Sequence, residues 1–176
     1  MKYPLWLALL VTSLAGVAGA QTAPSGDLSV GYSPLYILKG YTVWMNGARG
    51  TASFNINDWL SVAGDIGGYR GFVPESITGE TYLFGPRISF RKQPRMTPFL
   101  QALFGGSHFS EYTGGITGVG QEFAFMVGGG GDFALARESK FALRLEGDFV
   151  GIRSSGSTTP AARLSIGFVY RLGGKR

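Results

Sequence analysis

The sequence of 176 residues contains no cysteine, one histidine and only 15% charged residues. Without cysteine the chain can form neither a disulfide nor a thiolate metal site. Because no acidic cluster surrounds the one histidine, we expect neither a metal site nor a cofactor. Apart from residues 5–17, the chain also lacks an apolar run that reads as a membrane-spanning helix. These absences argue against a disulfide scaffold, a metalloenzyme and a helical membrane protein.

What the sequence has instead is a regular alternation of apolar and polar residues. In the segment 162–172 the even positions are apolar or aromatic, whereas the odd positions include Arg163, Ser165 and Arg171. Successive side chains of a strand point to opposite faces, so this strand has one apolar and one polar face. The same alternation predicts eight strands, each long enough to span a membrane at a tilt, at 27–37, 45–56, 59–70, 79–91, 97–109, 121–135, 139–152 and 160–172. The expected fold is an all-β, eight-stranded, antiparallel, up-and-down transmembrane β-barrel.

The connections between these strands alternate in length. Those after even-numbered strands are short, at 57–58, 92–96 and 136–138. Those after odd-numbered strands are longer, at 38–44, 71–78, 110–120 and 153–159. Outer-membrane barrels have short periplasmic turns and longer external loops. We therefore expect both termini in the periplasm and the longer loops outside the cell.

The first twenty residues have the pattern of a cleavable signal peptide. Lys2 supplies the positive charge, residues 5–17 form a short apolar stretch, and Ala18-Gly19-Ala20 offers small residues at a cleavage point. We predict a signal peptide over 1–20, a lead-in over 21–26, an outer-membrane barrel domain over 27–172 and a tail over 173–176. The expected location is the outer membrane of a Gram-negative cell.

Aromatic residues gather near the strand ends on the apolar face, as interfacial girdles do. The two groups lie toward the short turns (Trp59, Phe90, Phe133, Phe141 and Tyr170) and toward the longer loops (Tyr36, Tyr82, Phe123 and Phe149). Because such rings favour the depth of the lipid headgroups, the two groups predict the two membrane interfaces.

The opposite face of the strands carries the residues that we expect to form a charge network inside the barrel: Arg49, Asp65, Arg87, Arg144, Glu146, Asp148, Arg163 and Arg171. The interior of an eight-stranded barrel is just wide enough for side chains to fill. Buried charges must be paired there, since stranding one partner costs about 3–5 kcal/mol. We predict that Arg144, Glu146 and Asp148 pair with Arg163 and Arg171, and that Asp65 pairs with Arg87.

The basic balance of the chain and its glycine run do not indicate nucleic-acid or nucleotide binding. The net charge is +5, but the arginines stand singly in strands and turns and form no basic cluster. Residues 128–131 are all glycine, yet no Gly-Lys-Ser/Thr follows and no helix opens after them. We expect these glycines to relieve crowding inside a narrow barrel.

One short motif could carry chemistry. His108 and Ser110 are two residues apart, so they share the outward face of a strand near the external edge. This His-x-Ser arrangement resembles that of the outer-membrane lipid A deacylases, which are also eight-stranded barrels. A hydrolase would further need an acid to orient the histidine, and Glu111 falls on the other face. A lipid A-modifying hydrolase therefore stays an alternative.

Most of the chain resembles a known family. The stretches that carry the resemblance are Asn57-Asp58-Trp59-Leu60-Ser61-Val62-Ala63-Gly64-Asp65, Phe84-Gly85-Pro86-Arg87, the run 97–106 and the closing run 163–172. They are similar to the barrel-only outer-membrane proteins of the OmpA/OmpX-like superfamily. That resemblance implies an envelope structural protein, a surface protein for adhesion or immune contact, or a narrow pore.

The sequence therefore predicts a monomeric, non-enzymatic envelope protein whose long external loops contact partners. The expected partners are outer-membrane lipids and lipopolysaccharide, the outer-membrane assembly machinery and an extracellular ligand, but no nucleic acid. Exposed aromatic residues anchor interfaces, so the candidate loop contacts are Tyr41, Trp44, Tyr69, Phe72 and Tyr112. The alternatives are a small-solute pore with space at inward glycines, the lipid hydrolase, and a soluble lipocalin-like carrier with the two faces exchanged.

Overall fold

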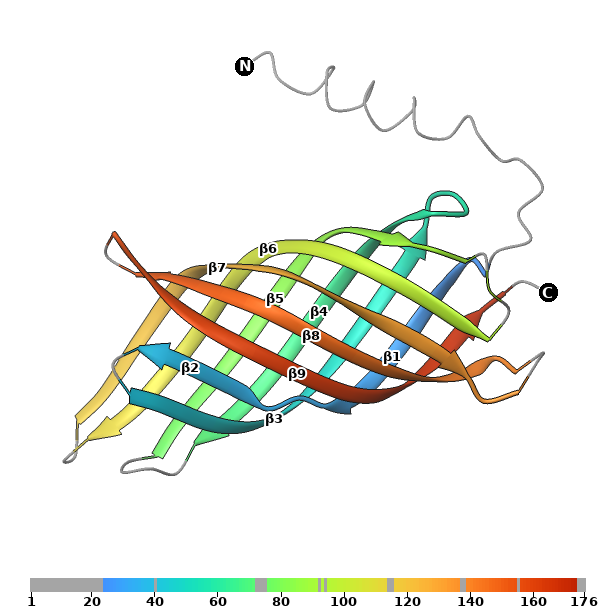
Figure 1. The fold of residues 1–176 in the computed structure, drawn as a ribbon. Coiled ribbons are helices and arrows are strands. Elements are labelled where there is room, and N and C mark those ends of the chain that lie inside the picture. The colour runs from blue at the N-terminus through green and yellow to red at the C-terminus, as the bar shows by residue number, and fades with distance from the viewer. Residues whose placement is uncertain are drawn as a thin grey trace, which may run out of the picture.

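The computed structural model describes residues 24–39, 41–71, 76–91, 93, 95–113, 116–136, 139–154 and 156–173. The predicted signal peptide and Phe72 lie outside these ranges. The described residues form nine strands (Figure 1): β1 (Gly26–Tyr32), β2 (Leu35–Lys39), β3 (Tyr41–Asn55), β4 (Leu60–Gly71), β5 (Ser76–Ser89), β6 (Met96–Thr113), β7 (Ile116–Ala134), β8 (Phe141–Ser154) and β9 (Ser157–Leu172). In the described part of the chain, no helix has the length and apolar character needed to cross a membrane.

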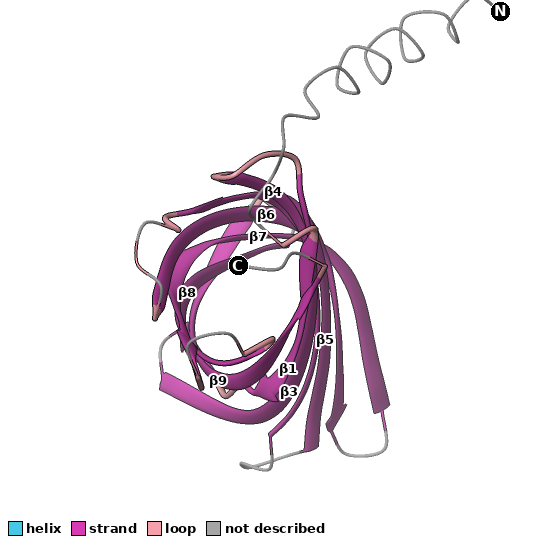
Figure 2. Cartoon of the chain, turned by 90° about the vertical axis from the view of Figure 1, so that its right-hand side faces the viewer, coloured by secondary structure: helices cyan, strands magenta, loops and turns pink. Residues whose placement is uncertain are grey.

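The strands close into a barrel because the first pairs with the last. Every pairing is antiparallel, and β1 lies between β3 and β9. β1 and β2 form one barrel strand that is interrupted at Ser33 and Pro34, where proline has no N–H for the ladder. Their registers against β3 and β9 continue across the break without a shift. The predicted eight-stranded antiparallel barrel is therefore confirmed, and Figure 2 shows its strands as a closed ring.

The strands continue further than the sequence predicted at one end. We name the end where β1 begins and β9 ends the turn end, and the opposite end the far end (Figure 1). At the far end, only residues 114–115 separate β6 from β7, and only residues 155–156 separate β8 from β9. The predicted long loops at 38–44, 110–120 and 153–159 are thus wrong, because most of those residues pair as strand.

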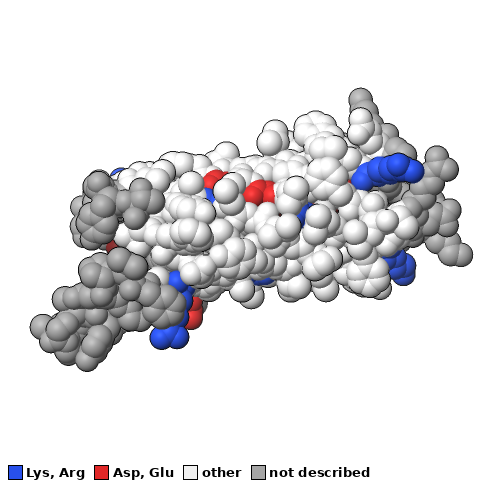
Figure 3. Space-filling model, turned by 60° about the horizontal axis from the view of Figure 1, so that its bottom comes forward, with Lys and Arg blue, Asp and Glu red and all other residues white. Residues whose placement is uncertain are grey.

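The assignment of inward and outward faces is confirmed. Phe54, Ile66 and Phe84 are each about two-thirds exposed on the outer face, whereas Arg87 and Arg163 are at most 2% exposed inside. Figure 3 shows the middle of the barrel as a mostly uncharged surface, with small patches of acidic and basic atoms visible in it. This is the reverse of a lipocalin-like carrier, which keeps its charges outside.

Four aromatic rings lie against glycines directly across a strand pair, on both faces of the wall. In each pair, ring atoms occupy the space that a Cβ on the glycine would need. The pairs are Tyr69 with Gly47, Tyr82 with Gly106, Phe109 with Gly79, and Phe125 with Gly151. Cross-strand contacts of this kind pin the register of neighbouring strands.

Candidate functional site

The interior nearest the turn end holds a balanced layer of charges, which we name the lower layer. Arg144 donates hydrogen bonds to both carboxylate oxygens of Asp132, from Nε at 2.6 Å and from Nη2 at 2.8 Å. It also reaches Asp27 Oδ1 at 3.0 Å, and Arg87 lies 3.5 Å from the same oxygen. Both guanidinium groups stack on the Phe99 ring, at 4.7 and 4.8 Å from its centroid. Two positive and two negative side chains therefore neutralise each other around one aromatic ring.

The next layer, which we name the middle layer, contains more negative than positive side chains. Arg163 donates from Nη1 to Asp65 Oδ1 at 2.9 Å and from Nε to Asp148 Oδ2 at 3.0 Å. Arg49 forms an ion pair with Asp65 and another with Glu146 Oε1 at 2.5 Å. Each of these five side chains is at most 4% exposed to solvent. Three carboxylates thus surround two guanidinium groups.

Gln101 joins the two layers. Its Oε1 accepts hydrogen bonds from Nε and Nη2 of Arg87, at 3.0 and 2.8 Å. Its Nε2 donates to Glu146 Oε1 at 2.5 Å and lies 3.3 Å from Asp148 Oδ1. The amide therefore faces a cation with its oxygen and the carboxylates with its nitrogen, so both layers belong to one network.

The structure brings most of the predicted charge network together and confirms the predicted pairing of Arg163 with Glu146 and Asp148, while other partners differ. Arg49, Arg87, Arg144, Glu146, Asp148 and Arg163 lie inside with Asp65. The predicted pair of Asp65 with Arg87 is wrong, because Asp65 contacts Arg49 and Arg163 while Arg87 contacts Asp27. Asp27 is a network member that the sequence interpretation missed, although its alternation with Leu28 and Val30 placed it inward. Arg171 stands directly across from Asp27 in the ladder, half-buried at the turn end.

Beyond the charged layers, the interior toward the far end is apolar. Its buried cluster consists of Leu35, Met45, Ala63, Tyr69, Leu83, Leu103, Ala124, Met126, Val150, Ile152 and Ala161. Ile37, Val43, Ile77 and Phe109 pack against this cluster. The inside of the barrel is therefore filled by two materials, a charge network toward the turn end and a hydrophobic core toward the far end.

Two of the inward glycines leave no open space beside them in the described part of the barrel. A Cβ at Gly128 would collide with the Asp148 carboxylate, and one at Gly67 would collide with the Tyr69 hydroxyl group. Between the Asp27, Arg87 and Asp132 side chains at the turn end, a cavity of about 20 Å³ remains. That volume holds about one water molecule. Neighbouring side chains have thus taken the room that these glycines provide.

The candidate hydrolase residues lie on the outer face near the far end. His108 stands across from Glu80 on β5 and from Gln121 on β7. Within the described side chains, neither the His108 ring nor the Ser110 hydroxyl group makes a hydrogen bond or ion pair. The described residues also contain no group of three His, Asp or Glu able to hold a metal ion. Among the described side chains, no acid therefore orients the His108 ring, and the side chain of Glu111 lies outside the described part.

The candidate loop contacts fall in different environments. Trp44 is 57% exposed on β3 and packs beside Tyr36, with 5.5 Å between the ring centroids. Tyr69 is 4% exposed and accepts a hydrogen bond from Arg163 at 3.0 Å, so it belongs to the interior and is not a surface contact. The backbones of Tyr41 and Tyr112 lie in β3 and β6, and their side chains are outside the described part. Phe72 lies outside the described residues altogether.

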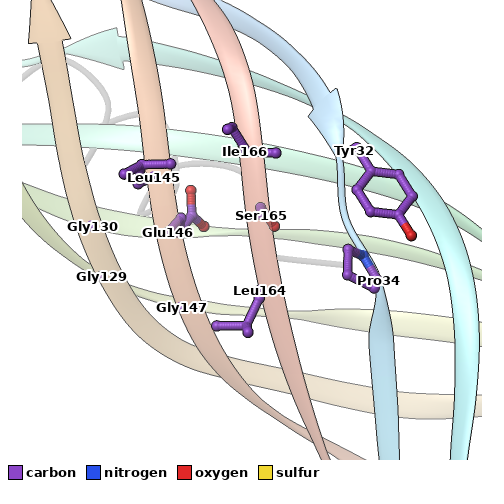
Figure 4. A pocket seen from close by; sticks show the side chains of 10 residues that line it. All are labelled: Tyr32, Pro34, Gly129, Gly130, Leu145, Glu146, Gly147, Leu164, Ser165 and Ile166. Atoms are coloured by element: carbon purple, nitrogen blue, oxygen red, sulfur yellow. The ribbon is translucent and has the colours of Figure 1, made fainter.

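The outer wall carries a shallow groove of about 560 Å³ between β7, β8, β9 and the break at Pro34. Figure 4 shows Leu145, Leu164 and Ile166 along it, with Tyr32 and Pro34 at one side. Two of its lining positions are the outward glycines Gly129 and Gly147. No cluster of charged side chains converges on this groove, so we assign it to the apolar belt.

We compared the sequence and the structure with those of known proteins. No family model matches the sequence, and no curated protein matches it. Solved structures do match: Neisserial surface protein A has a TM-score of 0.72 at 16% identity over 84% of this chain and 97% of its own. The chain has the fold of the small outer-membrane barrels.

Two further structures share that small outer-membrane barrel fold. Ail, the attachment invasion locus protein of Yersinia pestis, matches with a TM-score of 0.61 at 14% identity, over 85% of this chain and 99% of its own. The N-terminal barrel domain of Pseudomonas aeruginosa OprF matches with 0.56 at 15% identity, over 84% and 99%. Each match covers almost the whole of the other chain, so the likeness extends over the entire barrel.

Proposed function

We propose that this protein is a closed, non-enzymatic, monomeric barrel of the bacterial outer membrane that supports the envelope and presents its far end to partners. The observation that carries the proposal is the filled interior. Arg163 is 1% exposed and Leu103 is fully buried, so side chains fill both the charged and the apolar half. In an eight-stranded barrel filled in this way, side chains occupy the space that a channel would need.

The far end supports a role in surface contact through the strands themselves. Beyond Tyr82, several outward positions are polar, with Asn46, Arg70, Glu80 and Gln121 exposed, while Trp44 remains an exposed aromatic residue. At the same heights the inward positions are apolar, as Tyr69, Ile77 and Phe109 are. This arrangement, with polar residues outside and apolar residues inside, suits water rather than lipid. The far end would then project from the membrane as a rigid rim, with lipopolysaccharide as its nearest neighbour.

A small-solute pore is the main alternative, and conductance separates the two. The mature chain would be refolded into planar bilayers beside an open porin, and the same sample checked for a heat-dependent shift in gel mobility. We expect the shift, which reports a folded barrel, and no discrete current steps. Current steps from the shifted, folded protein would overturn the closed-barrel proposal. A protein without the shift that fractionates with soluble periplasmic proteins would overturn its membrane location.

A further inference from the structure

The two ends of the barrel carry different charges. The described residues of the turn-end segments 56–59, 90–96, 135–140 and 171–173 include four basic and one acidic residue, a side-chain charge of +3. The described residues of the far-end segments 38–44, 70–81, 108–122 and 153–158 include three basic and three acidic residues, a charge of 0 with histidine neutral. Figure 3 shows this contrast on one face, with only Lys and Arg visible at the right-hand end and both signs at the left-hand end.

Four described cations of the turn end share a depth because each stands near an outward aromatic residue. The sequence neighbours are Phe90 and Arg91, Lys140 and Phe141, and Tyr170 and Arg171. Arg95 joins this group through its carbonyl oxygen, which accepts a hydrogen bond at 2.9 Å from Ala134, the residue after Phe133. Aromatic rings of a membrane protein favour the headgroup region. The neighbouring cations therefore lie level with lipid phosphates.

Two of these cations are available to a ligand. Arg91 is already held, since it donates to the Asp58 carbonyl oxygen at 2.5 Å and to Asn55 Oδ1 at 2.8 Å. Arg95 and Lys140, by contrast, are exposed and form no side-chain hydrogen bond or ion pair with any described residue. They belong to neighbouring turns, one between β5 and β6 and the other between β7 and β8.

We propose that the turn end binds anionic phospholipid headgroups of the leaflet that it faces, with Arg95 and Lys140 as the main contacts. The inference rests on the proposed membrane location and adds a lipid class to it. A zwitterionic headgroup carries its own positive charge, so a cluster of guanidinium and ammonium groups favours lipids with net negative charge. Each Lys or Arg near an anionic surface contributes about 1 kcal/mol, which is a factor of about five in affinity.

The test compares lipid preference in two variants with equal charge change. The mature chain is refolded into vesicles of phosphatidylcholine with phosphatidylglycerol, and spin-labelled forms of both lipids report which one associates with the protein. The wild type should prefer phosphatidylglycerol, and added salt should weaken the preference. The double variant Arg95→Gln/Lys140→Gln should lower the preference by up to about fivefold per charge removed. The far-end control Arg70→Gln/Arg153→Gln should leave it unchanged.

Three outcomes would overturn the inference. The first is a wild type without preference for phosphatidylglycerol, and the second is an equal loss in both double variants, which would report net charge only. The third is a wild type that shows no lipid preference but co-sediments with peptidoglycan sacculi. If the double variant Arg95→Gln/Lys140→Gln abolished this co-sedimentation, the partner would be the cell wall. Heat-dependent gel mobility of the same samples separates these outcomes from failure of the proposed function. A shifted, folded protein that shows no preference contradicts the lipid inference alone.

Discussion

The membrane-spanning part of this barrel and its far end use opposite distributions of polarity on one continuous wall. Between the aromatic girdles, Arg163 and Asp65 face the axis while Ile66 and Phe84 face outward. Beyond Tyr82, Phe109 packs inside while the neighbouring His108 turns outward. The backbone pairing of β5 with β6 extends into both regions. The comparison teaches that strand architecture alone does not decide which face is apolar. On the proposed membrane location, the change of polarity marks where the membrane ends.

The largest expected change in stability comes from removing a cation from the charged half. Arg163→Leu would leave Asp65 and Asp148 without the guanidinium group that both contact. Breaking a buried ion pair from one side costs about 3–5 kcal/mol, so we expect a loss of that size in unfolding free energy. Urea unfolding in lipid vesicles, followed by tryptophan fluorescence, measures it. The control Arg153→Gln, at an exposed outward position, should change stability by at most about 0.5 kcal/mol. Equal effects of the two variants would contradict the network.

A somewhat smaller effect should come from the apolar half. Leu103 is fully buried, and Leu103→Ala should cost about 3 kcal/mol through lost contacts and the cavity that is left. Leu100→Ala on the same strand is the matched control, because Leu100 faces outward and is 58% exposed. Lipid chains can fill the space left at Leu100, so that loss should be clearly smaller. If Leu100→Ala were as costly as Leu103→Ala in the same urea titration, the far half would not be a packed core.

The smallest effect distinguishes carboxylates within the middle layer. Asp65 contacts both Arg49 and Arg163, whereas Glu146 shares its donors with Asp148 and leaves Oε2 without a hydrogen-bond partner. Glu146→Gln removes one of two adjacent like charges, so it should change stability by less than about 1 kcal/mol. Asp65→Asn should cost about 2 kcal/mol, because it weakens two charge-assisted hydrogen bonds. A cost of Glu146→Gln that equals or exceeds that of Asp65→Asn would show that the third carboxylate is essential to the layer.

Much of the fold could be predicted from the alternation, since Phe168 and Arg171 must face opposite ways whatever their neighbours do. The far end could not, because residues 114–120 are rich in glycine and look like a loop although most of them pair in β7. The reversal of polarity beyond Tyr82 also breaks the pattern by which spanning strands were recognised. In this region the strands remain hydrogen-bonded, although the apolar residues now lie on the inner face.

The charge partners were harder to predict for a geometric reason. Alternation places Asp65 and Arg87 inward on neighbouring strands, yet Asp65 meets Arg163, which comes from β9. β4 and β9 are not neighbours in the sheet, so this contact crosses the interior and depends on the tilt and stagger of the strands. A pattern along one strand carries no information on stagger. The sequence therefore identified the inward residues and the pairing of Asp148 with Arg163 on adjacent strands, but not the contacts that cross the interior.

The pairing of β1 with β9 determines when the barrel can close. Ser25 and Leu172 are hydrogen-bonded although they stand 147 residues apart, so the ring closes only with the last strand to be synthesised. Until then β1 has an unpaired edge, and no shorter part of the chain is a finished product. The whole barrel segment must therefore be made and kept from premature pairing before β1 and β9 meet. Its slowest and most vulnerable moment comes after translation has ended.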